Sequence, residues 1–275
     1  MYKFLSPTTT EQACKLLRDT QNLRILAGGT DLIIALKDNI AVCDYVMDIK
    51  KIPSLNELEE SADGLSVGAA VTIGRLKESG LLQGCYHALF QSASELANSL
   101  LRNRATLAGN ICNASPGGDM LPSCLALGAW VETMSANGGR RIALENFFTG
   151  PKKHVLTPDE MVVRTVIPKS GGFSTFRKKK RIRGHDLAQI SVACSYGTDK
   201  ALTLAFGAAA PTPVKLELGS IERAQLRERK YDIVNKAAEF VKPIGDVRSS
   251  KEYRLAMIRH MTAEVIEEIL ERMEA

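Results

Sequence analysis

The sequence contains a short segment of small residues, Leu26-Ala27-Gly28-Gly29-Thr30-Asp31-Leu32. It follows a short apolar run, Leu23–Leu26, of strand length and precedes a second apolar run at 32–36. A glycine turn placed there can aim backbone N–H groups at an anion, because glycine permits close approach and positive φ. The spacing is neither G-x-G-x-x-G nor G-x-x-x-x-G-K-[ST], so the dinucleotide-fold and P-loop mechanisms do not apply directly. Taken alone, the motif favours a plain strand–turn connection.

A second small-residue segment lies far downstream. Thr106-Leu107-Ala108-Gly109-Asn110 is another such turn, and Ser115-Pro116-Gly117-Gly118-Asp119 follows closely. Two turns of this kind could hold a pyrophosphate between them, with the hydroxyls of Thr30 and Thr106 as further donors. Neutral donors of this type suit a tightly held cofactor better than a reacting phosphate. Asp119 would accept a hydrogen bond from an N–H or ribose hydroxyl group, or alternatively cap a helix that begins at the next residue.

Composition and charge are those of an ordinary folded protein. The 275 residues are 45% hydrophobic and 24% charged, which excludes disordered, collagen-like and membrane classes. The formal net charge is +5, and residues 177–183 alone hold six positive charges and no acid, so the rest of the chain is near neutral. One basic spot on a near-neutral body argues against a general nucleic-acid binder.

Targeting and metal-site signals are missing from the sequence. No apolar run approaches the ~18–20 residues of a membrane span, and the start lacks the apolar region of a signal peptide, so we expect a cytoplasmic protein. The six cysteines are scattered singly without a CxxC pair, which predicts reduced thiols rather than disulfides, zinc or an iron–sulfur cluster. The four histidines have no metal-ligand spacing, and no nucleophile motif appears. We therefore predict neither catalytic nor metal-binding residues.

Hydrophobic periodicity predicts the order of elements in the first two parts of the chain. The first part ends at Pro53 and the polar residues 56–63, which we interpret as a subdomain seam. The expected elements are a helix capped within Thr8–Thr10, strands at 23–26, 45–49 and 65–69, a short helix from Thr72 to Gly80, a buried helix at 87–101, a glycine- and asparagine-rich passage at 103–119, a helix at 121–127, a hairpin of 130–135 and 140–144, and a strand at 161–167.

Gly171-Gly172 predicts a second boundary. Beyond it, a run of strands precedes a run of helices, which indicates an α+β domain with helices on one face of an antiparallel sheet. We therefore expect a first domain at 1–170, with subdomains of about 1–52 and 53–170, and a second domain at 171–275. The expected elements of the second domain are strands at 173–178, 190–196 and 202–206 and two charged helices at 221–241 and 250–274.

Several strings, in order and over most of the chain, resemble the FAD subunits of molybdenum hydroxylases. That family includes xanthine dehydrogenase, nicotinate dehydrogenase and aerobic carbon monoxide dehydrogenase, and the likeness is strongest to the separate FAD subunit of bacterial xanthine dehydrogenases. The resemblance implies a two-subdomain FAD-binding domain of the vanillyl-alcohol-oxidase/PCMH type, not a Rossmann fold, followed by an α+β domain of the carbon monoxide dehydrogenase flavoprotein type. The strings are 26–32, 105–119, 159–162, 176–188, 204–213 and 249–254.

The resemblance also implies cofactor-binding residues. The two glycine segments would bind the FAD pyrophosphate, and Asp119 would lie near the adenosine or ribitol portion. The aliphatic residue beside the flavin falls at Met161 or Val162, and the lysine near the isoalloxazine falls at Lys178, within a residue or two. Many relatives have Gly-Gly where this chain has Ala108-Gly109. The implied residues are Leu26, Ala27, Gly28, Gly29, Thr30, Asp31, Leu32, Thr106, Leu107, Ala108, Gly109, Asn110, Asp119, Glu160, Val162 and Lys178.

By resemblance, the chain is an electron-transfer subunit. It would pass electrons from iron–sulfur clusters through FAD to NAD or another acceptor, in the oxidation of xanthine, purines or related N-heterocycles. Its partners would be an iron–sulfur subunit with [2Fe-2S] clusters and a molybdenum subunit with molybdopterin, in a dimer of heterotrimers. The alternative is a non-catalytic interaction protein whose glycine turns are structural and whose basic run docks a partner. That run, Arg177–Arg183, is a solvated face, an anion-binding patch or a cation beside the flavin.

Overall fold

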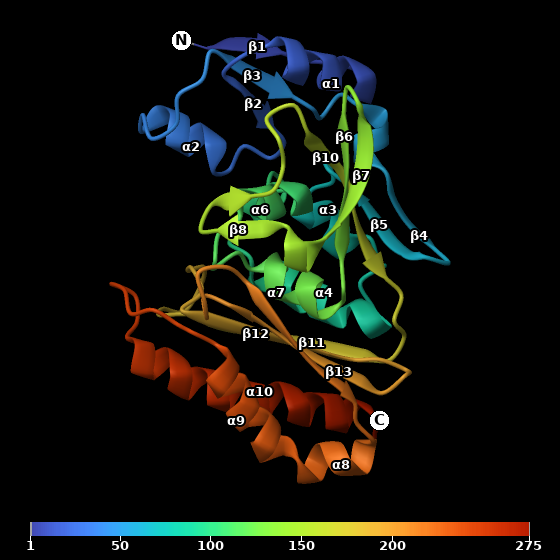
Figure 1. The fold of residues 1–275 in the computed structure, drawn as a ribbon, viewed down its shortest axis with the longest axis vertical. Coiled ribbons are helices and arrows are strands. Elements are labelled where there is room, and N and C mark those ends of the chain that lie inside the picture. The colour runs from blue at the N-terminus through green and yellow to red at the C-terminus, as the bar shows by residue number, and fades with distance from the viewer. Residues whose placement is uncertain (1, 275) are drawn as a thin grey trace.

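Three layers of structure follow one another along the long axis of the molecule, in chain order (Figure 1). The computed structural model describes residues 2–274. The uppermost layer in Figure 1 is a three-stranded parallel sheet of order β1-β3-β2, whose strands β2 and β3 the sequence predicts. Thr9 begins the first helix by accepting a hydrogen bond from the Gln12 N–H, which confirms the expected cap. The elements are β1 (Lys3–Leu5), α1 (Thr10–Asp19), β2 (Leu23–Leu26), α2 (Leu32–Lys37) and β3 (Tyr45–Asp48).

The middle layer is a five-stranded antiparallel sheet of order β4-β5-β10-β6-β7. Its central strand, β10 (Met161–Pro168), returns from far along the chain to join the two hairpins β4–β5 and β6–β7. The other strands are β4 (Leu58–Ser61), β5 (Gly64–Gly68), β6 (Trp130–Ser135) and β7 (Gly138–Ala143), and the small pair β8 (Phe148–Gly150) and β9 (Lys153–His154) lies apart. The helices are α3 (Ile73–Glu78), α4 (His87–Glu95), α5 (Ser99–Arg102), α6 (Leu107–Asn113) and α7 (Met120–Ala126), with 3-10 turns at 53–56, 84–86 and 144–146.

Two expectations for this layer are wrong. The helix expected at 87–101 is two helices, because Ala97 has φ 42° and Asn98 caps α5 by accepting a hydrogen bond from the Leu101 N–H. The turn expected at 106–110 lies in helix α6, which Thr106 caps. The polar residues 56–63 also contain an exposed edge strand that was not predicted, because β4 pairs there with β5.

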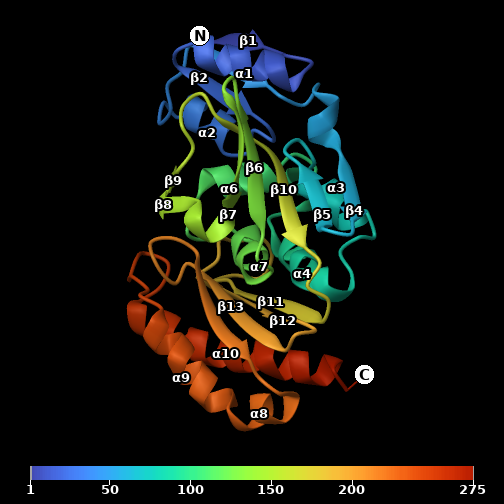
Figure 2. The same ribbon diagram turned by 45° about the vertical axis from the view of Figure 1, so that its right-hand side comes forward.

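The lowest layer is a four-stranded antiparallel sheet with helices, as the sequence predicts. Figure 2 shows α8–α10 covering one face, while α4 and α7 of the middle layer lie on the other. The helix expected at 221–241 is two helices that meet at Arg229, and the fourth strand was not predicted. The elements are β11 (Phe173–Lys179), β12 (Ile190–Tyr196), β13 (Ala201–Gly207), β14 (Val214–Ser220), α8 (Arg223–Glu228), α9 (Lys230–Phe240) and α10 (Lys251–Arg272).

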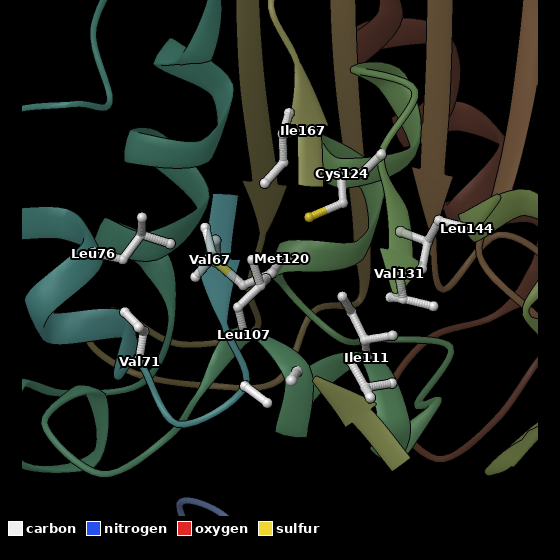
Figure 3. Close-up of a cluster of buried hydrophobic side chains, with 14 of the residues drawn as sticks. Val67, Val71, Leu76, Leu107, Ile111, Met120, Cys124, Val131, Leu144 and Ile167 are labelled. Atoms are coloured by element: carbon white, nitrogen blue, oxygen red, sulfur yellow. The ribbon is translucent and has the colours of Figure 1, made fainter. Parts of the chain in front are cut away.

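The largest hydrophobic core lies between the five-stranded sheet and helices α3, α4, α6 and α7, and it extends to α1. Figure 3 shows part of it, with Leu107 and Ile111 of α6 and Met120 and Cys124 of α7 pointing into the cluster. A second buried cluster lies between the four-stranded sheet and α8–α10. Because α6 and α7 are fixed by this packing, the segment 114–119 between them is held at both ends. Within residues 2–274 no helix is long and apolar enough to cross a membrane.

Candidate functional site

The two glycine segments meet in space. Gly28 lies so close to the backbone before α6 that a Cβ atom there would be 2.2 Å from the Arg104 carbonyl oxygen and 2.9 Å from the Ala105 Cα. Only glycine allows this approach. Gly29 has φ 76°, a left-handed conformation that glycine adopts without strain. The two glycines of one turn therefore meet two different requirements, and together they place the loop 26–32 beside the start of α6.

Side-chain hydrogen bonds join the same segments. The Asn113 side-chain amide at the end of α6 donates to the Asp31 carboxylate at 2.9 Å, and Lys152 Nζ donates to the side-chain oxygen Oδ1 of Asn113 at 2.9 Å. On the other side of the loop, Lys50 donates to the Ala27 carbonyl at 3.2 Å and pairs with Asp48 at 2.6 Å. Asn113 lies within the string 105–119 that carries the family resemblance, whereas nothing in the sequence pointed to Lys50 or Lys152.

Helix α6 distributes its residues between the core and the loop. The Thr106 hydroxyl oxygen accepts the Gly109 N–H at 2.9 Å, so it caps the helix, and its own proton stays free to donate. Leu107 and Ala108 are buried in the hydrophobic core, against which Ala27 of the loop 26–32 also packs. The Asn110 side-chain oxygen is buried and has no hydrogen-bond partner within the described residues. Such an acceptor fits a ligand that carries a hydroxyl or N–H group.

Asp119 and Lys178 form a buried ion pair between the middle and lowest layers. Lys178 Nζ lies 2.8 Å from Asp119 Oδ2 and 3.2 Å from the Glu95 carbonyl oxygen, and its side chain is 0% exposed. Burial raises the pKa of Asp119 to about 6, although the nearby Lys178 ammonium acts in the opposite direction. The helix-cap alternative for Asp119 is wrong, because its side chain makes no cap hydrogen bond to α7. Its Oδ1 atom is buried without a partner in the described part of the chain, as at Asn110.

The basic run is largely neutralised by the fold. Four of its six cations lie in ion pairs, and they involve both faces of β11. The pairs are Arg177–Glu268 at 2.5 Å, Lys178–Asp119 at 2.8 Å, Lys180–Glu95 at 2.6 Å and Arg181–Asp186 at 4.0 Å. This pairing weakens the alternative of a basic docking patch, because a patch for an acidic partner requires charge that is not already compensated.

Glu160 has a different environment from the rest of the predicted site. Its two carboxylate oxygens accept hydrogen bonds from Arg140 Nε and Nη2, both at 2.7 Å, from the Thr133 hydroxyl and from the Thr157 N–H. The Arg140 hydrogen bonds lower the pKa of Glu160 to about 2. Met161 and Val162, which follow it in β10, are buried in the core. Glu160 therefore anchors the residues before β10, while β10 itself, which carries Val162, packs against α6.

Known proteins match this chain over nearly its whole length. The family described as "FAD binding domain in molybdopterin dehydrogenase" matches residues 1–170, and "CO dehydrogenase flavoprotein C-terminal domain" matches residues 174–269. The chain is 32% identical to the xanthine dehydrogenase FAD-binding subunit of Escherichia coli O157:H7, over 98% of this chain and 97% of that one. The chain belongs to the FAD-binding subunits of the molybdenum hydroxylases. This confirms the family and makes the protein a flavoprotein-type subunit of an oxidoreductase complex.

Relatives within the family differ in their named activities. The glyceraldehyde dehydrogenase medium chain of Sulfolobus acidocaldarius is 28% identical, over 98% of each chain. In the crystal structure of quinoline 2-oxidoreductase from Pseudomonas putida 86, one chain superposes with a TM-score of 0.88 at 25% identity and covers 98% of this chain and 97% of that one. The fold class, an FAD-binding domain followed by an α+β domain with an antiparallel sheet, is thereby confirmed.

Proposed function

We propose that this chain binds FAD between the two glycine segments and is the electron exit of a molybdenum hydroxylase. The observation that carries the proposal is the close approach of Gly28 to the Arg104 carbonyl, which brings the loop 26–32 against the start of α6. Backbone N–H groups and hydroxyls at that meeting point are suited to lining a pyrophosphate with neutral donors. In this proposal Leu26–Leu32, Thr106, Gly109 and Asn110 hold the pyrophosphate end.

The other end of the cofactor is assigned to the joint between the layers. Asp119 offers a buried oxygen that lacks a donor, and Lys178 holds the carboxylate in place from β11. Bound FAD would supply a redox centre that collects electrons singly and passes them on as a pair. The Lys178 ammonium would place positive charge near that centre, where negative charge develops on reduction. Glu160 would act indirectly, by anchoring the start of β10 next to Met161 and Val162.

The proposed partners supply the metal centres for which the described part of this chain has no ligands. No group of three or more metal-ligating side chains occurs within residues 2–274, so this part of the chain offers no site for an iron–sulfur cluster. We propose that an iron–sulfur subunit with [2Fe-2S] clusters and a molybdenum subunit with molybdopterin assemble with it, as a dimer of heterotrimers. Purines such as xanthine, or related N-heterocycles, are the proposed substrates of the complex, and NAD or another acceptor takes the electrons. We further propose two domains, 1–170 and 171–275, and a cytoplasmic location, which the scattered cysteines support.

Two preparations, the chain alone and the chain with its proposed partners, test the proposal. The chain purified alone should show flavin absorbance, with FAD released on denaturation, and should not oxidise xanthine or related heterocycles in the presence of an artificial dye. Co-expressed with an iron–sulfur and a molybdenum subunit, it should copurify with them and support substrate-dependent dye reduction. A colourless chain that takes up no added FAD would overturn the cofactor assignment. Turnover of a heterocycle by the isolated chain would overturn the electron-exit role.

A further inference from the structure

Arg254 is a buried cation whose place in the fold the proposed function leaves unexplained. It lies near the start of α10, only 3% exposed, and its guanidinium donates to the Ala208 carbonyl at 3.2 Å and to Asp246 Oδ1 at 2.8 Å. Asp246 in turn accepts the N–H groups of Arg248 and Ser249 at 2.9 and 3.2 Å. The guanidinium is thus fixed by a carboxylate that the turn before α10 holds in place.

The residue that Arg254 holds is conformationally unusual. Ala208, directly after β13, has φ 56°, a left-handed conformation that a residue with a Cβ adopts only when its surroundings determine it. Both of its backbone groups are used. The carbonyl accepts from Arg254, and the N–H donates to the Pro116 carbonyl at 2.6 Å. The left-handed turn therefore connects α10 directly to the segment 115–119.

Packing makes this connection tight. At Gly207, a Cβ atom would be 2.4 Å from the Ser191 hydroxyl and 2.9 Å from Pro122, so the turn lies directly against the start of α7. The Lys242 N–H also donates to the Ala209 carbonyl at 3.0 Å, which anchors the far side of the turn. Since interiors are closely packed, a shift of the turn at 207–209 is transmitted to the segment 115–119. That segment ends at Asp119, one of the proposed cofactor residues.

We infer that Arg254 is a positioning residue for FAD binding: through Ala208 it sets the place of the Pro116 carbonyl and hence of the segment 115–119. The inference rests on the proposed function because it assumes that the chain binds FAD. The structural step, from Arg254 through Ala208 to the segment 115–119, does not depend on that assumption. Arg254 does not contact the cofactor. Its hydrogen bond to the Ala208 carbonyl holds the left-handed turn in place. Loss of that bond releases the turn, and the hydrogen bond from the Ala208 N–H to the Pro116 carbonyl is then lost as well.

The test uses the full chain with Arg254→Met, which removes the donors and keeps the length, and Arg254→Lys, which keeps one charge. The matched control is Arg259→Met, because Arg259 lies on the same helix with an exposed side chain. Hydrogen exchange is measured without FAD at the Gly118 N–H, which donates to the Ser115 carbonyl at 2.9 Å. FAD affinity is then measured by titrating flavin into the apoprotein.

Arg254→Met should speed exchange at Gly118 and weaken FAD binding by about tenfold each, with Arg254→Lys between it and the wild type and the control unchanged. Should Arg254→Met fail to fold, Asp246→Asn releases the guanidinium more gently and should give smaller changes in the same direction. A folded Arg254→Met or Asp246→Asn chain with wild-type exchange at Gly118 and wild-type FAD affinity would overturn the inference. A wild-type chain that binds no FAD would overturn the proposed function instead, and the exchange rates would still test the positioning step.

Discussion

At the scale of the residue, Gly28 and Gly29 show how one dipeptide can be required for two reasons. Positive φ is needed at Gly29, where the backbone has φ 76°. At Gly28 the requirement is space, because the loop touches the Arg104 carbonyl. The sequence motif predicted a turn with close backbone approach, but not that the close neighbour is the backbone leading into α6. A contact between segments so far apart in the chain carries no local signal.

We predict that Gly28→Ala lowers FAD content without unfolding the chain. The added methyl must separate the loop 26–32 from Arg104, an overpacking that costs about 1–3 kcal/mol of unfolding free energy and displaces the proposed pyrophosphate donors. Gly150→Ala is the control, because a Cβ atom there meets nothing closer than 3.8 Å. Flavin absorbance per mole of purified protein is the measurement. A full flavin complement in Gly28→Ala would show that this loop does not hold the cofactor.

At the scale of the element, the residues before β10 depend on the Glu160–Arg140 contact. Arg140 comes from β7, and its bidentate hydrogen bonds join that edge strand to the residue that precedes β10. The Thr133 hydroxyl on β6 donates to the same carboxylate. Three strands are therefore held by one side chain, which explains why a carboxylate stands there without contacting the two glycine segments.

We predict that acid removes this contribution and that Arg140→Met reduces its pH dependence, since Arg140 is the largest but not the sole cause of the lowered pKa of Glu160. The pKa of Glu160 is lowered from 4.5 to about 2 in the folded chain, so its contribution is present above pH 4.5 and is lost as the pH falls towards 2. Allowing for the solvent around the half-exposed Arg140, the contribution is about 2 kcal/mol. Urea unfolding of both proteins at about pH 6 and pH 3 measures it. An Arg140→Met chain that loses as much stability in acid as the wild type would contradict this assignment.

Elements that carry their own signals could be predicted, and those that depend on distant packing could not. Thr9 and Thr72 cap α1 and α3 because a threonine precedes an apolar helical pattern. The break between α4 and α5 requires a positive φ at Ala97, and an alanine in a sequence does not indicate that conformation. Helix α6 could not be predicted because the glycine and asparagine residues of 103–119 are typical of a loop. The helix is stabilised by the burial of Leu107 and Ile111. At α6, the burial of apolar side chains therefore outweighs the local preference of the sequence for a loop.

At the scale of the whole molecule, the joint between the middle and lowest layers is polar as well as hydrophobic. Strand β11 is an edge strand, and Gln91 of α4 satisfies part of its free edge, because its Oε1 accepts the Phe176 N–H at 2.7 Å. In return, the Ser174 hydroxyl of β11 accepts the Ala88 N–H in the first turn of α4 at 2.9 Å. Two residues further along the strand, Lys178 reaches Asp119. The proposed cofactor residues Asp119 and Lys178 thus belong to different layers, so the integrity of the joint and the integrity of the site are linked.

We predict that Lys178→Met weakens this joint strongly, because it leaves the Asp119 carboxylate buried without its cation. The expected loss is about 3–5 kcal/mol of unfolding free energy at neutral pH. The loss should shrink as the pH falls towards about 6. Lys178 lowers the pKa of Asp119, so its removal raises that pKa above the wild-type value of about 6, and the unpaired carboxyl then takes up a proton. The double variant Lys178→Met/Asp119→Asn should recover most of the loss, since no buried charge is left unpaired.

The control is Lys179→Met. The Lys179 side chain points to the opposite face of β11, so this variant should change the free energy of unfolding by less than about 0.5 kcal/mol. A pH-independent loss that the second substitution does not repair would mean that Lys178 acts through packing alone, and the joint would then owe its stability to the hydrophobic contacts of α4 and α7.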